Sequence, residues 1–142
     1  MKLLLDTHIA LWAVVDSPKL GAVARELILA AENSIYVSAA SVWEIAIKYG
    51  LNKAAGDTAD PLTGRGGMPV SALRAAELFA LSDYQSLPIN WAHAQAVAAL
   101  PTMKSHADPF DRMLVAQARC ESMMLLTRDT LVASYGGQVM LV

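Results

Sequence analysis

The chain has 142 residues, of which 55% are hydrophobic and only 17% are charged, a length that fits one domain. Its formal net charge of −2 excludes the broad basic surface that drives indiscriminate nucleic-acid binding. The single cysteine, Cys120, excludes an internal disulfide, and its place among apolar residues at helical spacing predicts a buried thiol. Neither a signal peptide nor a membrane span is indicated, so we expect a cytoplasmic protein with no membrane partner.

Short apolar runs alternate with longer helix-like stretches from one end of the chain to the other. The expected strands are 3–5, 35–37, 87–89, 124–126 and 139–142. The expected helices cover about 7–15, 21–32, 41–50, 71–80, 91–100 and 109–121. This alternation predicts an α/β fold, with a central parallel β-sheet of four to five strands flanked by helices on both faces. The glycine-rich segment 53–67 breaks the pattern and is expected to form a loop.

The first two acids of interest each have an adequate structural explanation. Asp6 follows the run 3–5 and could simply cap the helix that comes next, an interpretation as good as a functional one. Glu44 completes the Ser-x-x-Glu pattern of a capping box that starts at Ser41. It also precedes Lys48 by four residues, which is a favourable pair on a helix. Taken alone, Glu44 is therefore better explained by structure than by chemistry.

The remaining acids also stand where helices are expected to begin. The sequence Asp108-Pro109-Phe110-Asp111 has the features of a helix start, but a cap needs only one of its two acids. Residues three apart on a helix share one face, so Asp108 and Asp111 could point toward the same ion. Asp129 comes three residues after the end of the apolar run 124–126. It could cap a short helix toward Tyr135.

All these acids follow expected strands or open the helices just beyond them. Because the carboxyl ends of parallel strands share one edge of a sheet, the acids are expected to converge there in one pocket. Clustered carboxylates raise one another's pKa and require a cation or shared protons at neutral pH. Oxygen ligands without a Cys/His zinc spacing favour Mg²⁺ or Mn²⁺.

Several other polar and aromatic residues have weaker interpretations. His106 could orient a carboxylate or touch a phosphate, and for Arg112 and Arg128 phosphate contact and ion pairing with the acids are equally good alternatives. A local basic rim could be extended by Lys48, Lys53, Arg65 and Lys104. Three tryptophans stand among aliphatic residues at helical spacing and are expected in the core, namely Trp12, Trp43 and Trp91.

Four runs of the sequence resemble the four blocks of the PIN-domain family. They are LLLDTH at 3–8, SVWEIAIK at 41–48, DPFDRMLVAQA at 108–118 and LLTRD at 125–129. In order and spacing they look most like the VapC-type toxins of bacterial toxin–antitoxin pairs, and they span nearly the whole chain, which suggests a single PIN domain over 1–142. The segment 54–67 looks longer than is usual in such proteins.

The resemblance implies a metal-dependent endoribonuclease that hydrolyses RNA phosphodiester bonds by metal-activated water. By motif position the catalytic, metal-binding acids are Asp6, Glu44, Asp111 and Asp129. We expect Glu44 to bind a second ion or orient the water, while the other three are the main ligands. The supporting residues by the same comparison are Asp108 and Thr7, beside His106 and Arg112.

The resemblance also implies partners: an RNA substrate, a cognate VapB-like antitoxin that occludes the active site, and a second copy in a homodimer. The main alternative is a catalytically silent PIN-like module that only binds an antitoxin-like protein or RNA. The presence of all four motif acids argues against this alternative.

Overall fold

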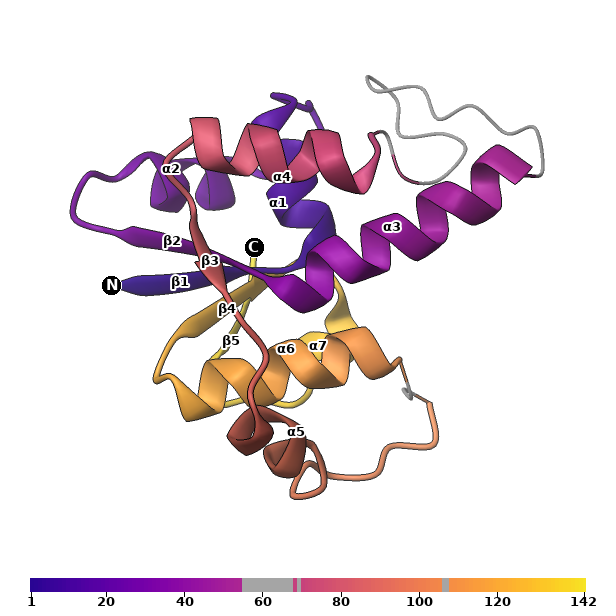
Figure 1. The fold of residues 1–142 in the computed structure, drawn as a ribbon. Coiled ribbons are helices and arrows are strands. Elements are labelled where there is room, and N and C mark those ends of the chain that lie inside the picture. The colour runs from indigo at the N-terminus through magenta and orange to yellow at the C-terminus, as the bar shows by residue number, and fades with distance from the viewer. Residues whose placement is uncertain (55–67, 69, 106–107) are drawn as a thin grey trace.

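The computed structural model describes residues 1–54, 68, 70–105 and 108–142 (Figure 1). The strands are β1 (Lys2–Leu5), β2 (Ser34–Ser38), β3 (Gln85–Leu87), β4 (Met124–Thr127) and β5 (Val139–Leu141). The helices are α1 (Thr7–Val14), α2 (Ala22–Leu29), α3 (Ala39–Ala54), α4 (Ala72–Leu81), α5 (Trp91–Val97), α6 (Pro109–Cys120) and α7 (Thr130–Ala133). The predicted α/β fold with a parallel sheet is confirmed, because the five strands pair in parallel in the order β3-β2-β1-β4-β5.

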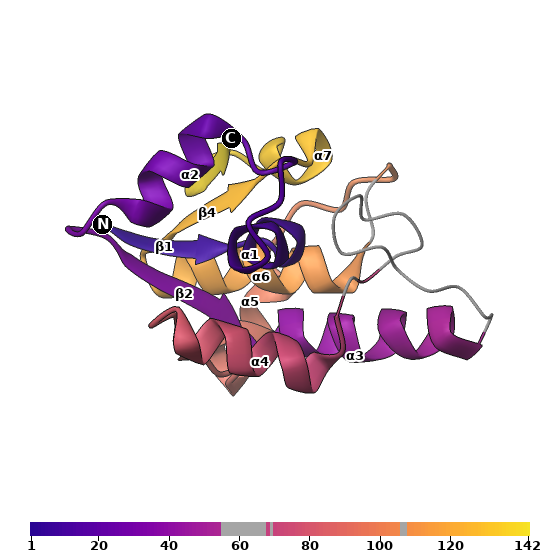
Figure 2. The ribbon, with the colours of Figure 1, turned by 90° about the horizontal axis from the view of Figure 1, so that it is seen from above.

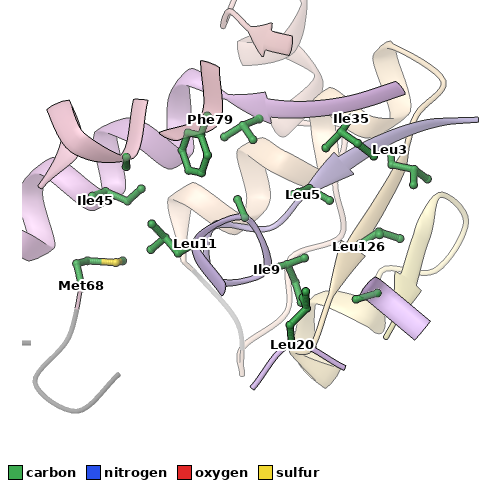
Figure 3. Close-up of a cluster of buried hydrophobic side chains, with 14 residues drawn as sticks. Leu3, Leu5, Ile9, Leu11, Leu20, Ile35, Ile45, Met68, Phe79 and Leu126 are labelled. Carbon is green, nitrogen blue, oxygen red and sulfur yellow. The ribbon is translucent and has the colours of Figure 1, made fainter. Parts of the chain in front are cut away.

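Alternating side chains of the strands build a core on each face of the sheet. Leu3 and Leu5 enter one buried cluster, whereas Leu4 between them enters the other. The first cluster lies under α1, α2 and α4, and Figure 3 shows Ile9 of α1 on the side of Leu126 of the sheet and Leu11 on the side of Ile45 of α3. The second cluster lies under α5, α6 and α7 on the opposite face (Figures 1 and 2). A strand buried on both faces reads as a continuous apolar run, as LLL does here.

The strand order fixes where a site can form. β1 lies between β2 and β4, and its last residue, Leu5, is level with Val37 and with Leu126. The chain extends the sheet to one side of β1 through β2 and β3, and then to the other side through β4 and β5. The crevice beyond the carboxyl ends of β1 and β4 is therefore a topological switch point, where ligands bind in open α/β sheets. Helix α3 starts at this edge and projects beyond the sheet (Figure 1).

Several expectations about the strands and the buried residues differ from the structure. β3 ends at Leu87 rather than 89, since Pro88 has no N–H to donate to a ladder. Cys120 is exposed, because α6 ends there. Trp43 and Trp91 are 58% and 87% exposed, so neither is a core residue.

The predicted loop 53–67 begins later than expected, because α3 continues to Ala54. Its remainder, 55–67, lies outside the described residues. None of the helices that the structure describes is long and apolar enough to cross a membrane.

Candidate functional site

A cavity of about 560 Å³ opens at the carboxyl edge of the sheet. It brings together the five acids singled out from the sequence, which come from the ends of β1 and β4, from α3 and from the start of α6. The full lining is Asp6, His8, Ile9, Trp12, Glu44, Lys48, Asp108, Asp111, Arg128, Asp129 and Thr130. Residues separated by more than 120 positions along the chain thus face one space, as expected from a parallel sheet.

Asp6 stands at the N-cap position of α1, yet its side chain makes no capping hydrogen bond. The side chain is buried, at 7% exposure, and its Oδ2 accepts a hydrogen bond from Thr127 Oγ1 at 2.6 Å. Burial is the largest influence and raises the pKa of Asp6 above its ordinary value, and the nearby charge of Glu44 adds to the rise. The Thr127 hydrogen bond and the charge of His8 act in the opposite direction without cancelling it. Because the Asp6 side chain makes no hydrogen bond that caps α1, the capping interpretation of Asp6 is wrong.

Thr127 is a residue that the sequence did not single out. It is fully buried at the end of β4, and its hydroxyl both donates to Asp6 and accepts the backbone N–H of Asp129 at 3.0 Å. One hydroxyl thus links the first and fourth motif acids. The signal in the sequence is a hydroxyl residue ending an otherwise apolar strand, two positions before an acid.

The predicted capping box at Ser41 is wrong. The N-terminus of α3 lies earlier, where Ser38 Oγ accepts the N–H of Ala40 at 2.9 Å, so Ser41 lies inside the helix. Ser41 instead accepts a hydrogen bond from Thr7 Oγ1 at 3.0 Å. The strand β2 reaches Ser38, and this serine takes the role that the pattern assigned to Ser41. Glu44 therefore takes no part in a helix cap.

Glu44 is buried, at 3% exposure, and pairs with Lys48 through its Oε2, as the helix spacing predicted. Its other oxygen, Oε1, is buried without a hydrogen-bond partner among the described residues. Burial lowers the pKa of Lys48, but the hydrogen bond and charge of Glu44 and the charges of Asp108 and Asp111 outweigh it, and the pKa is raised. An ammonium group held in its charged form therefore lies within the acidic cluster.

The predicted helix caps at the last two acidic sites are confirmed. Asp108 caps α6 by accepting the N–H groups of Phe110 at 2.9 Å and Asp111 at 3.2 Å. Asp111 lies in the first turn of α6 and lines the cavity. Asp129 caps α7 by accepting the N–H of Leu131 at 2.7 Å and is exposed. Both capping acids also face the cavity, so capping and site formation use the same residues.

Some of the supporting residues line the cavity and others do not. Thr7 is fully buried and is not among the residues that line the cavity. Arg112 donates to Pro101 O and Tyr135 Oη at 2.9 and 2.8 Å and is not among the lining residues, and its interpretations as a phosphate contact or as an ion-pair partner of the acids stay predictions. Arg128 does line the cavity, whereas His106 lies outside the described residues.

The acidic side chains that line the cavity are of the type that binds a hard divalent cation. The acids offer carboxylate oxygens alone, and Glu44 Oε1 is an unsatisfied buried acceptor. In their present orientations, no three His, Cys, Asp or Glu side chains among the described residues could hold a metal ion. Glu44 is turned to Lys48, and Asp129 is bonded to a helix amide. Metal binding therefore stays a prediction.

The model of the PIN domain matches residues 3–137. This chain belongs to the PIN-domain family. The match covers the four motif blocks and extends from β1 through β4, and it confirms the resemblance drawn from the sequence. Comparison of the PIN domain with curated proteins gave no match.

Solved structures share the fold of this PIN domain. VapBC2 from Rickettsia felis, bound to a promoter DNA fragment, is similar with a TM-score of 0.65 and 18% identity over 100% of this chain and 98% of that one. A toxin–antitoxin complex from Klebsiella pneumoniae has a TM-score of 0.58 and 20% identity over 97% and 95% of the two chains. A domain of a functionally unknown protein from Methanocaldococcus jannaschii has a TM-score of 0.53 and 16% identity, over 99% and 90%. At these identities the likeness concerns the fold.

Proposed function

We propose that this PIN domain is a VapC-type toxin, a metal-dependent endoribonuclease that cleaves RNA phosphodiester bonds. The observation that carries the proposal is the cavity at the switch point, which gathers Asp6, Glu44, Asp111 and Asp129 around one space, where Glu44 Oε1 has no hydrogen-bond partner within the described part of the chain. A buried carboxylate oxygen without a donor is costly in a folded protein, and a cation is the group that would satisfy it.

The acids have distinct parts in this proposal. Asp6, Asp111 and Asp129 are the main ligands of Mg²⁺ or Mn²⁺, and Glu44 holds a second ion or orients the attacking water. When bound, the ion lowers the pKa of water and neutralises charge on the phosphate. Thr127 keeps the Asp6 carboxylate in place through its 2.6 Å hydrogen bond. This contact restricts Asp6 to one orientation, which a precisely placed ligand requires.

The substrate's negative charge needs cations near an acidic cavity. Lys48 and Arg128 both line this one, and Lys48 is held in its charged form. In the proposed reaction they attract the phosphates on either side of the cleaved bond. A net charge of −2 leaves the chain without a general affinity for nucleic acid, so this local pair directs the RNA to the acids.

The likeness to VapBC2 and to a toxin–antitoxin complex supports a VapB-like antitoxin as protein partner. An exposed apolar stripe on α3 also supports protein partners. Trp43, Ile47 and Leu51 are 58%, 41% and 65% exposed and follow one another at four-residue spacing, which places them on one side of the helix. Such a stripe gains stability when it is covered. The antitoxin and a second copy in a homodimer are the partners we propose.

The test is an RNA cleavage assay with antitoxin-free protein in Mg²⁺ or Mn²⁺, beside Asp6→Asn and Asp111→Asn variants. Wild type should cut RNA, and each variant should lose at least about 100-fold in rate, the order expected when a group essential to the transition state is removed. Asp83→Asn is the matched control, because Asp83 is exposed, does not line the cavity, and has a positive φ of 57° that asparagine tolerates.

Equal cleavage by wild type and both cavity variants would mean that a contaminant cuts the RNA. An inactive wild type that still binds RNA or an antitoxin-like protein would instead support the silent module.

A further inference from the structure

A second group of residues lines the same cavity without belonging to the acidic motif. His8, Trp12 and Arg128 form what we call the aromatic wall. His8 and Trp12 are four residues apart on α1 and so lie on one side of the helix, with ring centroids 5.8 Å apart and planes tilted by 49°. The guanidinium carbon of Arg128 lies over the Trp12 ring, 5.8 Å from its centroid. A tryptophan, an imidazole and a guanidinium thus stand together beside the carboxylates.

The aromatic wall is held in place before any ligand arrives. Trp12 is half-buried and packs against the core cluster beneath α1. Arg128 donates from its Nη1 to the backbone oxygen of Lys19 at 2.7 Å, which holds its guanidinium over the ring. His8 and Arg128 are exposed. A fixed aromatic surface with exposed neighbours loses little entropy when a planar group stacks on it.

Two residues of the aromatic wall are also close in sequence to motif acids. His8 is two residues after Asp6, and Arg128 immediately precedes Asp129. Two of the acids, Asp6 and Asp129, therefore share backbone segments with the wall, just beyond the ends of β1 and β4. Their separation is fixed by local geometry and does not depend on a distant loop.

We propose that the aromatic wall is a nucleobase subsite, which stacks an unpaired base of the RNA strand while the adjoining phosphate lies over the acids. This inference rests on the proposed function. Every base has a π face, so stacking on Trp12 and on the Arg128 guanidinium accepts any base and selects single-stranded over paired RNA. The wall supplies apolar contact that phosphate and metal binding do not need.

The test uses Trp12 itself as reporter. The chain has three tryptophans, so a Trp43→Phe/Trp91→Phe variant leaves Trp12 as the one tryptophan, whose fluorescence can be excited selectively over that of the four tyrosines. With Asp6→Asn added to prevent cleavage, a single-stranded RNA octamer in Mg²⁺ should quench the fluorescence. An octamer of abasic ribose phosphate carries the same charge without bases and should not quench it.

Affinity provides the second readout. Trp12→Ala should weaken binding of the RNA octamer about tenfold or more, Trp12→Phe should retain most of it, and Trp91→Ala should have no effect, since Trp91 is 87% exposed and outside the cavity. Equal quenching or equal affinity with the abasic octamer would overturn the proposal. If Trp12→Ala fails to fold, the quenching measurement on the single-tryptophan protein still decides.

The inference and the proposed function fail in different ways. RNA that wild type cleaves but that leaves Trp12 unquenched would remove the subsite and keep the nuclease. RNA that is neither cleaved nor bound would remove both. Quenching by an antitoxin-like peptide, with none by RNA, would assign the aromatic wall to a protein partner and overturn the proposal.

Discussion

Thr127 Oγ1 lies 2.6 Å from Asp6 Oδ2, at the point where the neighbouring strands β1 and β4 end. The two residues are 121 positions apart in the chain, and both are buried. The same hydroxyl accepts the backbone N–H of Asp129. A single side chain thus maintains the spacing between two acids on which the proposed chemistry depends.

Thr127→Val should destabilise the protein because it keeps the shape of the side chain and removes the donor to a buried carboxylate. Hydrogen bonds to charged groups contribute about 1.5–3 kcal/mol, and the free energy of unfolding should fall by that order. Urea unfolding at pH 7 in EDTA measures it. Thr127→Ser is the matched control, since it retains the hydroxyl and should keep most of the stability and activity. A valine variant as stable as wild type would show that the contact is dispensable.

The raised pKa of Asp6 predicts a pH-dependent cost to folding. The folded chain binds this proton more tightly than the unfolded chain, whose Asp6 titrates near 3.8. Ionised Asp6 therefore lowers the free energy of unfolding above its raised pKa, and this penalty disappears below pH 3.8. In EDTA, Asp6→Asn should exceed wild type in stability at pH 7, and its advantage should shrink as the pH falls toward 4. Asp83→Asn should show no such trend, and a pH-independent advantage of Asp6→Asn would contradict the assignment.

Lys48 should compete with a divalent ion for Glu44. Lys48→Met removes the ammonium that pairs with Glu44 Oε2, and we expect the metal-free protein to lose about 1–2 kcal/mol, discounted because the lysine side chain is 41% exposed. Added Mn²⁺ should then raise the melting temperature of Lys48→Met more than that of wild type. A Glu44→Gln/Lys48→Met double variant should recover stability without metal and lose the enhanced response. A smaller Mn²⁺ shift in Lys48→Met would mean that Lys48 assists metal binding.

Asp108 allows its capping role to be separated from its charge. Asparagine caps helices about as well as aspartate, so Asp108→Asn should unfold within a few tenths of a kcal/mol of wild type, whereas Asp108→Ala should lose about 1 kcal/mol. If Asp108 only supports Asp111, which donates its N–H to it, Asp108→Asn should reduce RNA cleavage less than tenfold. Urea unfolding and cleavage rates give the two readouts. A loss as large as that of Asp111→Asn would make Asp108 a ligand in its own right.

The fold was predictable because its central strands are buried on both faces. The run Leu3–Leu5 needs apolar residues at every position, and such runs stand out between helical segments. The convergence of the acids was predictable for the same reason, since parallel strands that all end at one edge bring their following residues together. Local sequence patterns were therefore sufficient to predict features that depend on a single strand or helix.

The parts that could not be predicted depend on which elements become neighbours. The contact between Thr127 and Asp6 exists because β4 lies next to β1, an order that no local pattern encodes. Trp43 follows a helical apolar pattern but is 58% exposed on α3. Ser41 fits a capping box, but β2 continues to Ser38 and moves the helix start. In each instance tertiary context overrode a sound local signal.

On the proposed metal-dependent function, the pair formed by Lys48 and Glu44 would let the chain fold before a metal ion activates it. A site made only of carboxylates would repel itself until an ion arrived, and the nascent protein would depend on metal supply to complete its structure. Because the Lys48 ammonium already lies among the acids, the chain can fold in a metal-poor environment and remain folded without an ion. Chelation should accordingly leave a dormant and intact protein that regains activity on addition of a divalent ion, with no refolding step.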